Sequence, residues 1–390
     1  MALLDRWLAG EPAEAALTRW ARASRFAGSG DREAVRDLVY DAIRQRRSAA
    51  ALGGAPDDGR PVTGRALILG CLRAAGQPLP DWTDQRHAPD PLSPAEAARL
   101  AAPPPDMPRA AGLDIPDWLL PHFDQALGAR ADEVLSLMRT RAPVCLRANA
   151  ARITAPALAA RLADEGVQAG PHPLAPMALH VTAGARRLRA TRAFADGLFE
   201  LQDAASQAVA ERVAAAILSD LPAGARVLDF CAGGGGKALA LAARGLSVTA
   251  HDADPRRMRD LPVRAARAGA DIALTPDPAA GAPWPAILAD VPCSGSGSWR
   301  RAPEAKWTLT PDALAGLTAQ QDAILKRAAA LLAPGGVLGY ATCSLLRAEN
   351  EDRITALSAA LPGWACIDQM RLDPLDGGDG FFLALLRKPA

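Results

Sequence analysis

The sequence predicts a multidomain chain with an α-helical N-terminal domain, a small α/β subdomain and a C-terminal α/β domain built on a mainly parallel sheet. Three observations lead to this fold class. The first third shows helical periodicity only, a strand–helix–strand pattern occupies the middle, and strands alternate with helices from residue 225 onward. For 390 residues we expect three parts, 1–135, 136–200 and 201–390.

Two segments near the N-terminus predict helices. In DREAVRDLVYDAIRQRR (31–47), apolar residues recur at helical spacing, and arginines occupy the last turns, where positive charge suits the helix dipole. Asp31 stands where the residue that caps the helix start is expected. The segment 64–76 is apolar on nearly every side, which predicts a buried helix.

A proline-rich stretch follows, from Pro78 to Pro108. It contains a short helical run whose Ser93 and Glu96 fit a capping box, in which two side chains satisfy free N–H groups at a helix start. Another helical region is expected over 117–140. The first third shows no arrangement of residues that points to catalysis.

The pattern changes near residue 141, where strands over 143–149 and 177–183 are predicted to flank a helix over 154–166. This part is basic: residues 141–200 carry eight arginines and four acidic residues, although the net charge of the chain is only +1. A basic patch is typical of proteins that bind a polyphosphate, and a solvated charged face explains it equally well. The arginines that cluster are Arg186, Arg187, Arg189 and Arg192.

The alternation in the C-terminal part implies a mainly parallel sheet with helices on both faces. The expected strands are 225–232, 246–252, 271–277, 285–292 and 336–344, the expected helices are 237–245, 254–269 and 312–336, and 364–374 pairs with 380–388 as an antiparallel hairpin. Ligands of such sheets bind at the carboxyl ends of the strands. That edge should collect Asp229 to Lys237, Asp252, Asp277, Asp290 to Cys293 and Thr342 to Ser344.

A glycine-rich turn between a strand and a helix is the first candidate binding element. It consists of Cys231, Ala232, Gly233, Gly234, Gly235, Gly236 and Lys237. Glycines let a ligand approach the backbone and the N–H groups of the helix start, and the loop suits a dinucleotide or an adenosyl cofactor. Asp252 ends the next strand, where an acid can accept from ribose hydroxyls. The alternative role for Asp252 is to cap the helix that begins near Asp254.

The six cysteines form no CxxC pair, which argues against a zinc site or a disulfide scaffold and favours the reducing cytoplasm. Cys71, Cys145 and Cys366 lie in apolar runs and are expected in the core. Cys293 and Cys343 stand at strand ends beside small residues, which suggests nucleophilic chemistry, with packing as the alternative. The histidines show no metal-ligand spacing, and neither a membrane span nor a secretory signal is expected.

Six segments together resemble the RNA 5-methylcytosine methyltransferases of the Fmu/Sun class. The most specific are DVPCSGSGSWRRAPEAKW (290–307) and ATCSLLRAENE (341–351), and LDFCAGGGGKA (228–238) is similar to the first cofactor motif of the family. Residues 144–166, 194–210 and 378–388 resemble the small RNA-binding-like subdomain, the segment that leads into the catalytic domain and the last strand. The helical N-terminus is similar to the antiterminator-like RNA-binding domain of the methyltransferase B branch.

The resemblance implies a Rossmann-like class I methyltransferase domain with a seven-stranded, mainly parallel sheet, and S-adenosyl-L-methionine as cofactor. The glycine loop would hold the cofactor, with Asp252 at its ribose and Asp277 near its adenine. Cys343 would add to C6 of a cytosine, Asp290 would bind the ring edge, and Cys293 would assist release. The substrate would be RNA, most readily 16S ribosomal RNA, and the expected enzyme is a cytoplasmic monomer without metal.

Two positions depart from the family's first motif, since Gly234 replaces a proline and Ala238 replaces a threonine. Three other functions are considered. A DNA cytosine methyltransferase would use Cys293 as its nucleophile, and the Thr-Cys-Ser sequence at 342–344 argues against it. A non-catalytic RNA-binding or assembly factor with a decayed cofactor loop would not need the intact Cys343, Cys293 and Asp290. A nicotinamide dehydrogenase would explain the glycine loop but neither thiol.

Overall fold

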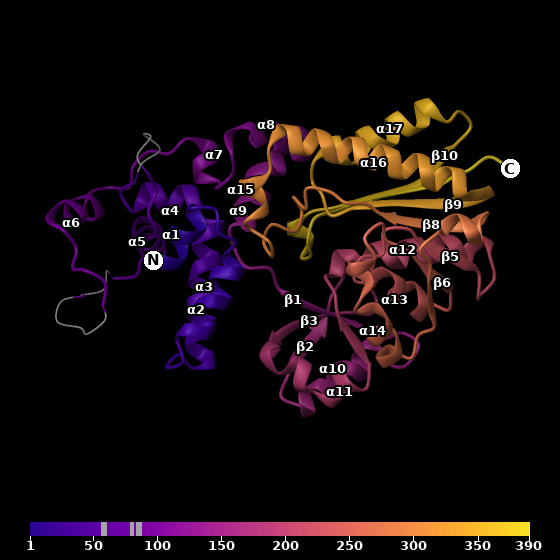
Figure 1. Cartoon of the computed structure of the whole chain (residues 1–390), viewed down its shortest axis with the longest axis horizontal. Coiled ribbons are helices and arrows are strands. Elements are labelled where there is room, and N and C mark those ends of the chain that lie inside the picture. Colours follow the sequence, from indigo (N-terminus) through magenta and orange to yellow (C-terminus); the bar gives the residue numbers. More distant parts are fainter. Residues whose placement is uncertain (56–60, 79–81, 83–87) are drawn as a thin grey trace. The chain divides into compact units, whose positions relative to one another are not determined.

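The chain folds into two compact units, seen in a computed structural model that describes residues 1–55, 61–78, 82 and 88–390. The helical unit combines Met1–Arg141 with Trp299–Thr308, and the α/β unit combines Ala142–Ser298 with Leu309–Ala390. Figure 1 follows the elements of both along the sequence. Of the proline-rich stretch, residues 79–81 and 83–87 lie outside the described residues.

The helical unit is built around a core in which Leu4, Ile43 and Leu67 are fully buried. These apolar residues come from three helices, so each helix buries one face against the others. The elements of the unit are α1 (Ala2–Leu8), α2 (Ala13–Ala23), α3 (Ser29–Arg44), α4 (Arg46–Leu52), α5 (Gly64–Ala74), α6 (Pro94–Ala101), α7 (Arg109–Gly112), η1 (Asp117–Leu119), α8 (Leu120–Leu127), η2 (Gly128–Arg130), α9 (Ala131–Met138) and α15 (Ala305–Thr308).

Several helix boundaries differ from the expected ones for local reasons. Helix α3 begins at Ser29, and Asp31 accepts a hydrogen bond from the backbone N–H of Gly28 (2.9 Å), so Asp31 lies inside the first turn instead of preceding it. The expected helix over 31–47 ends at Arg44 and α4 continues after Gln45. The region 117–140 is broken into short pieces, with Gly128 in a positive-φ conformation between two of them.

The capping box at the start of α6 is confirmed. The Ser93 hydroxyl accepts from the N–H of Glu96 (3.2 Å), and the Glu96 carboxylate accepts from the N–H of Ser93 (2.9 Å). The pattern was recognisable because both bonds are local and need no tertiary partner.

A ten-residue segment that follows the Cys293 loop in sequence belongs to the helical unit. The Glu304 carboxylate accepts from the N–H of Ala13 (2.9 Å), and the Lys306 ammonium donates to the carbonyl of Arg44 (2.8 Å). The Trp307 indole donates to the carbonyl of Ile43 (2.8 Å). The chain therefore leaves the α/β unit at Ser298 and re-enters it at Leu309, an excursion that no sequence pattern indicated.

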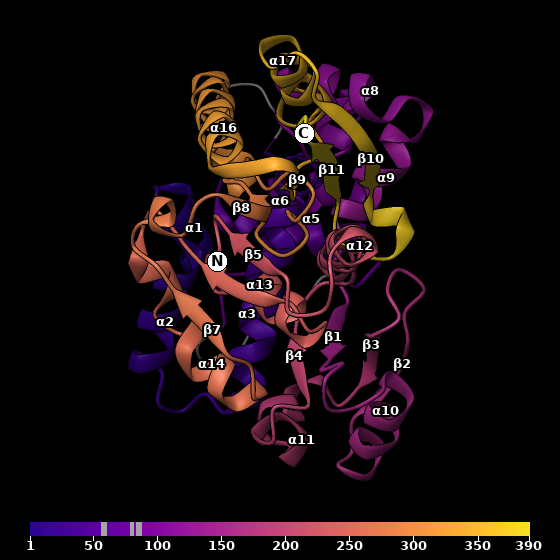
Figure 2. The same ribbon diagram turned by 90° about the vertical axis from the view of Figure 1, so that its right-hand side faces the viewer.

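The α/β unit opens with a four-stranded antiparallel sheet in the order β2-β3-β1-β4. Figure 2 shows this sheet with α10 and α11. Its elements are β1 (Val144–Ala148), α10 (Ala155–Asp164), β2 (Gln168–Pro171), β3 (Ala178–Ala183), η3 (Ala185–Ala190), α11 (Arg192–Ala195) and β4 (Phe199–Leu201). The expected two strands and helix are present. Strands β2 and β4 were missed because, at four and three residues, they are too short to show periodicity.

The larger sheet has seven strands in the order β10-β11-β9-β8-β5-β6-β7. Strands β9, β8, β5, β6 and β7 run parallel, and β11 and β10 join as antiparallel strands, which confirms the expected mainly parallel sheet and its closing hairpin. The strands are β5 (Arg226–Asp229), β6 (Ser247–Ala250), β7 (Ile272–Leu274), β8 (Trp284–Asp290), β9 (Leu332–Thr342), β10 (Ala365–Leu372) and β11 (Phe381–Arg387).

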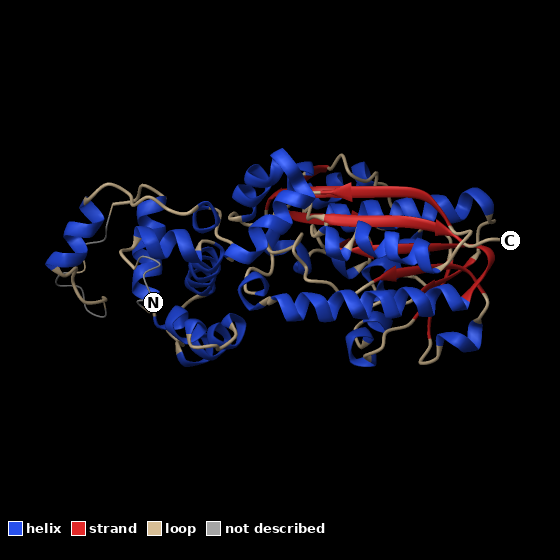
Figure 3. Cartoon of the chain, turned by 90° about the horizontal axis from the view of Figure 1, so that it is seen from above, coloured by secondary structure: helices blue, strands red, loops and turns tan. Residues whose placement is uncertain are grey.

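Helices cover both faces of this sheet (Figures 1 and 3). On one face α12 and α13 form an apolar core with the strands, and on the other α16 and α17 form a second core. The helices and single turns of this part are α12 (Ala204–Asp220), α13 (Gly236–Ala243), η4 (Pro255–Met258), α14 (Leu261–Ala268), η5 (Pro278–Gly281), α16 (Pro311–Leu331), η6 (Arg347–Glu349), α17 (Glu351–Ala360) and η7 (Pro374–Asp376).

Two expectations for this domain were wrong. The helix over 254–269 is interrupted and resumes at Leu261, because Pro262 has no N–H to continue a preceding helix and fits only a first turn. Cys366 is exposed on β10, a strand at the edge of the sheet, although its apolar neighbours suggested the core. Cys145 is buried as expected, and Cys71 is partly buried against the helical core.

One close backbone approach fixes the loop that carries Cys293. The N–H of Gly297 donates to the carbonyl of Cys343 (2.9 Å), and its carbonyl accepts from the N–H of Gly380 (2.8 Å). A Cβ atom on Gly297 would lie 2.1 Å from the carbonyl oxygen of Gly380. Backbone must move to admit it, so this loop depends on the absence of a side chain.

We expect Gly297→Ala to destabilise the α/β unit by about 1–3 kcal/mol, the usual cost of overpacking. Gly316→Ala is the matched control, because a Cβ atom at this position of α16 meets no heavy atom within 4 Å and alanine favours a helix by about 1 kcal/mol. The measurement is chemical denaturation followed by circular dichroism. An unchanged midpoint for Gly297→Ala would show that the loop is not held by this approach.

Candidate active site

The strand order reverses between β5 and β8, and this reversal locates the site. Strands β6 and β7 lie on one side of β5, and β8 and β9 lie on the other. In such sheets the crevice at the carboxyl ends of the strands beside the reversal binds ligands. The glycine loop follows β5, Asp290 ends β8, and Cys343 directly follows β9. The expected rim is therefore assembled at one crevice.

Two cysteine sulfurs meet at this edge. The Sγ atoms of Cys293 and Cys343 are 3.4 Å apart, and both residues are partly buried thiols. The contact follows from the parallel pairing of β8 and β9, in which Asp290 lies opposite Ala341. Two residues that are 50 positions apart in sequence can thus act on neighbouring atoms of one ligand.

An ion pair lies beside the two thiols. The Lys237 ammonium donates to the Asp290 carboxylate (2.6 Å) and also lies over the ring of Phe381, 4.8 Å from its centre. Burial disfavours the charged amine, but the Asp290 carboxylate outweighs burial and raises the pKa of Lys237 above its ordinary value. Lys237 is therefore a fixed positive charge at the site.

The surroundings give the two thiols opposite tendencies to ionise. The hydrogen bond from Cys293 and the charge of Lys237 lower the pKa of Cys343, against burial and Asp290. The hydrogen bond to Cys343, burial and the charge of Glu349 raise the pKa of Cys293 well above its ordinary value. Because the thiolate is the nucleophilic form, the arrangement favours attack by Cys343 with the proton held on Cys293.

The end of β5 carries a buried carboxyl that needs a partner. Asp229 is almost fully buried, and within the described chain neither of its carboxyl oxygens accepts a hydrogen bond of ordinary geometry. Burial, with a contribution from Asp290, raises the pKa of Asp229 to about 7. Such an orphaned group beside a glycine loop fits a bound molecule that presents hydrogen-bond donors. The sequence placed Asp229 on the rim without assigning it a role.

The glycine loop is tied to the end of β6. Gly233 and Gly235 have positive φ angles of 53° and 78°, which explains glycine at both positions. The Asp252 carboxylate accepts from the N–H of Gly233 (2.9 Å) and from that of Asp254 (3.0 Å). Asp254, not Asp252, caps η4, so the capping role considered for Asp252 is wrong.

Two arginines hold the carbonyl groups of this loop. Arg264 of α14 donates to the carbonyl of Gly234, and Arg147 of β1 donates to that of Gly236 (2.6 Å). Arg264 is in turn bound by the buried carboxylate of Glu200 on β4 (2.9 Å). The small sheet therefore supports the turn at the position where a glycine replaces the family's proline. The sequence did not indicate a role for Arg147 or Arg264, because an arginine on a strand or a helix is usually a solvated surface charge.

The positions of Ala232, Cys231 and Asp277 do not by themselves assign these residues to a ligand. Ala232 donates its N–H to the carbonyl of His251 (2.9 Å), which joins the loop to β6, and Cys231 is partly buried against the core. Asp277 is exposed, and its carboxylate accepts from the N–H of Ala279 (2.9 Å) at the start of η5. Asp277 follows β7, and its place near an adenine stays a prediction.

The predicted basic cluster lies on the small sheet's subdomain. Arg186, Arg187 and Arg189 are exposed on η3, and Arg192 is exposed at the start of α11. Leu188 between them is buried, so the turn is anchored by one apolar side chain while its charges face solvent.

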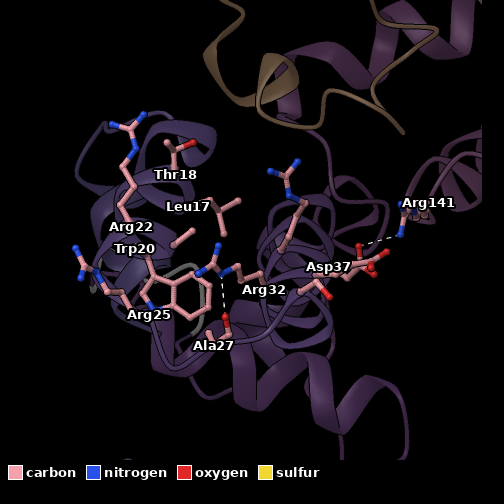
Figure 4. A pocket seen from close by; sticks show the side chains of 13 residues that line it. Leu17, Thr18, Trp20, Arg22, Arg25, Ala27, Arg32, Asp37 and Arg141 are labelled. Carbon is pink, nitrogen blue, oxygen red and sulfur yellow. Dashed lines mark hydrogen bonds and ion pairs between the residues drawn. The ribbon is translucent and has the colours of Figure 1, made fainter. Parts of the chain in front are cut away.

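The helical unit has a basic cleft of its own, which Figure 4 shows. It lies between α2 and α3 with a volume of about 910 Å³, and its lining includes Arg22, Arg25, Arg32, Arg36 and Arg141. Three of these are engaged, since Arg36 pairs with Glu14 and Arg141 with Asp37, both at 2.8 Å, and Arg32 donates to the carbonyl of Ala27 (3.0 Å). Arg22 and Arg25 are exposed and have no ion-pair partner in the part of the chain that the structure describes. The neighbouring Phe26 is 88% exposed.

Two kinds of feature are missing from the described residues. They contain no group of three or more His, Cys, Asp or Glu side chains placed to hold a metal ion. Their helices include none with the length and apolar character needed to cross a membrane.

Two family models match the chain, one within the α/β unit and one that begins in the last helices of the helical unit. The family model of the 16S rRNA methyltransferase RsmB/F matches residues 216–387, and that of the RsmF/B-like ferredoxin-like domain matches residues 115–186. The first covers the seven-stranded sheet and both cysteines, and the second covers most of the small sheet.

Curated relatives extend the match. The chain is 34% identical over 296 residues to the ribosomal RNA small subunit methyltransferase B of Xanthomonas campestris pv. campestris, an alignment over 70% of this chain and 66% of that protein. It is 35% identical over 294 residues to the protein of the same name from Xylella fastidiosa strain 9a5c, over 70% of this chain and 68% of the relative. The matched part is thus about two thirds of the relatives' length.

Solved structures show the same fold. The crystal structure of PH0851 aligns with a TM-score of 0.74 and 21% identity over 99% of this chain and 97% of its own. A methyltransferase homologue from Pyrococcus horikoshii aligns with a TM-score of 0.62 and 26% identity over 72% of this chain and 97% of its own. The identity to the curated relatives and the matching family models lead to one conclusion: the chain belongs to the RsmB/F family of 16S rRNA methyltransferases.

Proposed function

We propose that the protein transfers a methyl group from S-adenosylmethionine to C5 of a cytosine in 16S ribosomal RNA. The observation that carries the proposal is the pair of sulfurs 3.4 Å apart, beside the Lys237–Asp290 ion pair and the glycine loop. A cytosine C5 atom is a weak nucleophile, so the reaction needs covalent activation by one group and resolution by a second. This crevice offers both.

The residues present fit the cofactor. The backbone of the glycine loop would hold its methionine and adenosine ends, Asp252 its ribose hydroxyls, and Asp277 would lie near its adenine. Asp229 has two buried oxygens that accept no hydrogen bond of ordinary geometry in the described chain, and they suit the donors of a methionine moiety. When bound, S-adenosylmethionine supplies an electrophilic methyl group. The solved structure of NSun6 from Pyrococcus horikoshii with SFG, which is 19% identical, has the same fold (TM-score 0.61 over 70% of this chain and 98% of its own).

In the proposed reaction the Cys343 thiolate adds to C6 of the cytosine, and the electron pair of the C5–C6 double bond makes C5 nucleophilic. Asp290 binds the edge of the ring at N3 through a proton taken up from solvent, and this proton, shared between the carboxyl group and N3, neutralises the charge of the adduct until the product is released. Before the base arrives, the Lys237 ammonium donates to the Asp290 carboxylate, and its charge helps to lower the pKa of Cys343. The cytosine must leave its stack to reach this crevice.

Release requires loss of the C5 proton and of the enzyme. Once Cys343 is bonded to C6 it carries no charge, so Cys293 can lose its own proton to solvent and accept the proton from C5. The electron pair of that C–H bond re-forms the C5–C6 double bond and expels Cys343 as a thiolate. Cys293 lies 3.4 Å from the sulfur it releases. A DNA-type mechanism would instead make Cys293 the nucleophile, and the retained proton on Cys293 disfavours it.

We expect Cys293→Ala to accumulate a covalent protein–RNA adduct in the presence of S-adenosylmethionine. Its Cys343 can still attack C6 of the cytosine, but no thiol remains at position 293 to remove the C5 proton and release the enzyme. Cys343→Ala should form no adduct and transfer no methyl group. The measurement is the mobility of labelled RNA with the protein on a denaturing gel. Cys366→Ala is the matched control, since this thiol is exposed on β10. An adduct with Cys343→Ala and none with Cys293→Ala would reverse the two roles.

For RNA binding we propose that the helical domain 1–135 and the subdomain 136–200 hold the substrate while 201–390 performs the chemistry. Two basic surfaces support this division, the arginines on η3 and α11 and the cleft between α2 and α3. The site needs residues of one chain only, in keeping with the expected monomer, and with ribosomal RNA as substrate the expected compartment is the cytoplasm.

Charge reversal at Arg186, Arg187 and Arg189 to Glu should weaken RNA binding, because these exposed side chains lose their attraction to phosphates. Each lost contact should reduce the slope of log affinity against log salt by about 0.7–0.9. The measurement is fluorescence anisotropy with a 16S rRNA fragment at several salt concentrations. Lys326→Glu, on the exposed side of α16, is the control. An unchanged salt slope would remove the cluster from the RNA interface.

The cleft in the helical unit should bind single-stranded RNA through charge and stacking. We expect Arg22→Glu with Arg25→Glu to weaken binding and flatten its salt dependence, while Phe26→Ala should cost about 1–3 kcal/mol of stacking and leave the salt slope unchanged. Arg130→Glu reverses a charge of the same unit outside the cleft and serves as control. The same loss with Arg130→Glu would indicate a general charge effect and no specific cleft.

A further inference from the structure

A buried carboxylate lies beneath the two cysteine loops. Glu349 ends η6, which follows β9, and none of its side chain is exposed. One of its oxygens accepts from the N–H of Ser294 (2.8 Å) and the side-chain amide of Gln321 (3.0 Å). The other accepts from the hydroxyls of Ser294 and Ser344, both at 2.5 Å. Four donors satisfy the carboxylate, which is what makes a buried negative charge tolerable.

The donors connect this carboxylate to both thiols. Ser294 follows Cys293 in the loop after β8, and Ser344 follows Cys343 after β9. Glu349 thus binds the residue next to each reacting sulfur. A second link joins the loops directly, since the hydroxyls of Ser296 and Ser344 lie 2.9 Å apart.

The residue after Glu349 fixes the same strand end. The hydroxyl of Thr342 donates to the side-chain carbonyl of Asn350 (2.5 Å), and the Asn350 amide donates to the backbone carbonyl of Ser344 (2.9 Å). The Tyr340 hydroxyl donates to the carbonyl of Glu349 (2.5 Å). Hydrogen bonds to Glu349 and to the neighbouring Asn350 therefore fix the backbone that carries the Glu349 carboxylate.

The charges around the sulfur pair are unevenly distributed. The groups that act on it are Lys237 from α13, Asp290 from β8, Tyr340 from β9 and Glu349 from η6. Lys237 acts on Cys343, and Glu349 acts on Cys293. The contacts are uneven as well, since Glu349 accepts from both the N–H and the hydroxyl of Ser294, next to Cys293, but only from the hydroxyl of Ser344, next to Cys343. A negative charge held more closely to one loop and a positive charge that acts on the other thiol separate two groups that are chemically identical.

We propose that Glu349 is a positioning residue that locks the two cysteine loops together and keeps the shared proton on Cys293, so that Cys343 is the nucleophile. The inference rests on the proposed function only for the reaction that this asymmetry serves. The asymmetry itself belongs to the free protein and can be measured without RNA or cofactor.

Glu349→Gln tests the charge with little change of shape. Its amide can donate to the Ser294 and Ser344 hydroxyls, which rotate to accept, while its carbonyl still accepts from the backbone and from Gln321. The charge is lost and the links between the loops are kept. Asp352→Asn is the matched control, because it also removes one carboxylate from the same segment, where a partly exposed Asp352 pairs with Arg347 (3.1 Å).

The measurement is alkylation of each thiol by iodoacetamide in the intact protein between pH 6 and pH 9, with labelled peptides quantified by mass spectrometry. In the wild type Cys343 should react well before Cys293. Glu349→Gln should reduce the ratio of Cys343 to Cys293 labelling by about tenfold, the change that corresponds to one unit of pKa between the thiols. Asp352→Asn should leave the ratio unchanged.

An unchanged ratio in Glu349→Gln, with a melting temperature like that of the wild type, would overturn the role of the charge. Glu349→Asp is the conservative variant, which keeps the charge but shortens the reach, and it should retain the labelling preference. If the ratio shifts as expected but no variant, nor the wild type, methylates RNA, the proposed function fails while the inference about Glu349 stands. If the protein methylates RNA but the labelling ratio does not shift in Glu349→Gln, the inference about Glu349 fails while the proposed function stands.

Discussion

The contact between the sulfurs of Cys293 and Cys343 is the constraint on which the rest of the site depends. It exists because β8 and β9 are parallel neighbours at the point where the strand order turns, so two loops meet above one crevice. Glycine is required at position 297 because a side chain there would clash with the backbone of Gly380. The Glu349 carboxylate accepts hydrogen bonds from a serine of each cysteine loop. Two thiols at this distance must remain reduced, which suits a chain in which all six cysteines are free.

Electrostatics then assigns different roles to two identical side chains. The charge of Lys237, which is itself held by Asp290 at 2.6 Å, lowers the pKa of Cys343, whereas the charge of Glu349 raises the pKa of Cys293. The glycine loop that delivers Lys237 is supported from the small sheet, through Arg147 and Arg264. The subdomain proposed to hold RNA is therefore in physical contact with the loop proposed to hold the cofactor.

Much of this could be predicted from the sequence, and the exceptions have physical causes. Strand–helix alternation predicted the sheet, and strand ends predicted the rim, because both follow from local periodicity and one packing rule. The distance between the two sulfurs could not be predicted without knowing that β8 and β9 are neighbours. Glu349 and Arg264 escaped notice because their roles come from tertiary partners, and β2 and β4 are too short for a pattern. The start of α3 was expected after Asp31, about one turn later than its true start at Ser29, because more than one position in this segment can begin a helix.

The central claim is that Cys343 activates a cytosine so that C5 receives the methyl group. The most direct measurement is analysis of the product: 16S rRNA is incubated with the protein and S-adenosylmethionine carrying a labelled methyl group, digested to nucleosides and resolved by mass spectrometry. The account predicts that the label appears in 5-methylcytidine and that none appears with Cys343→Ala. Label on the exocyclic nitrogen of cytosine or on ribose would contradict it, because neither position needs a thiol adduct at C6.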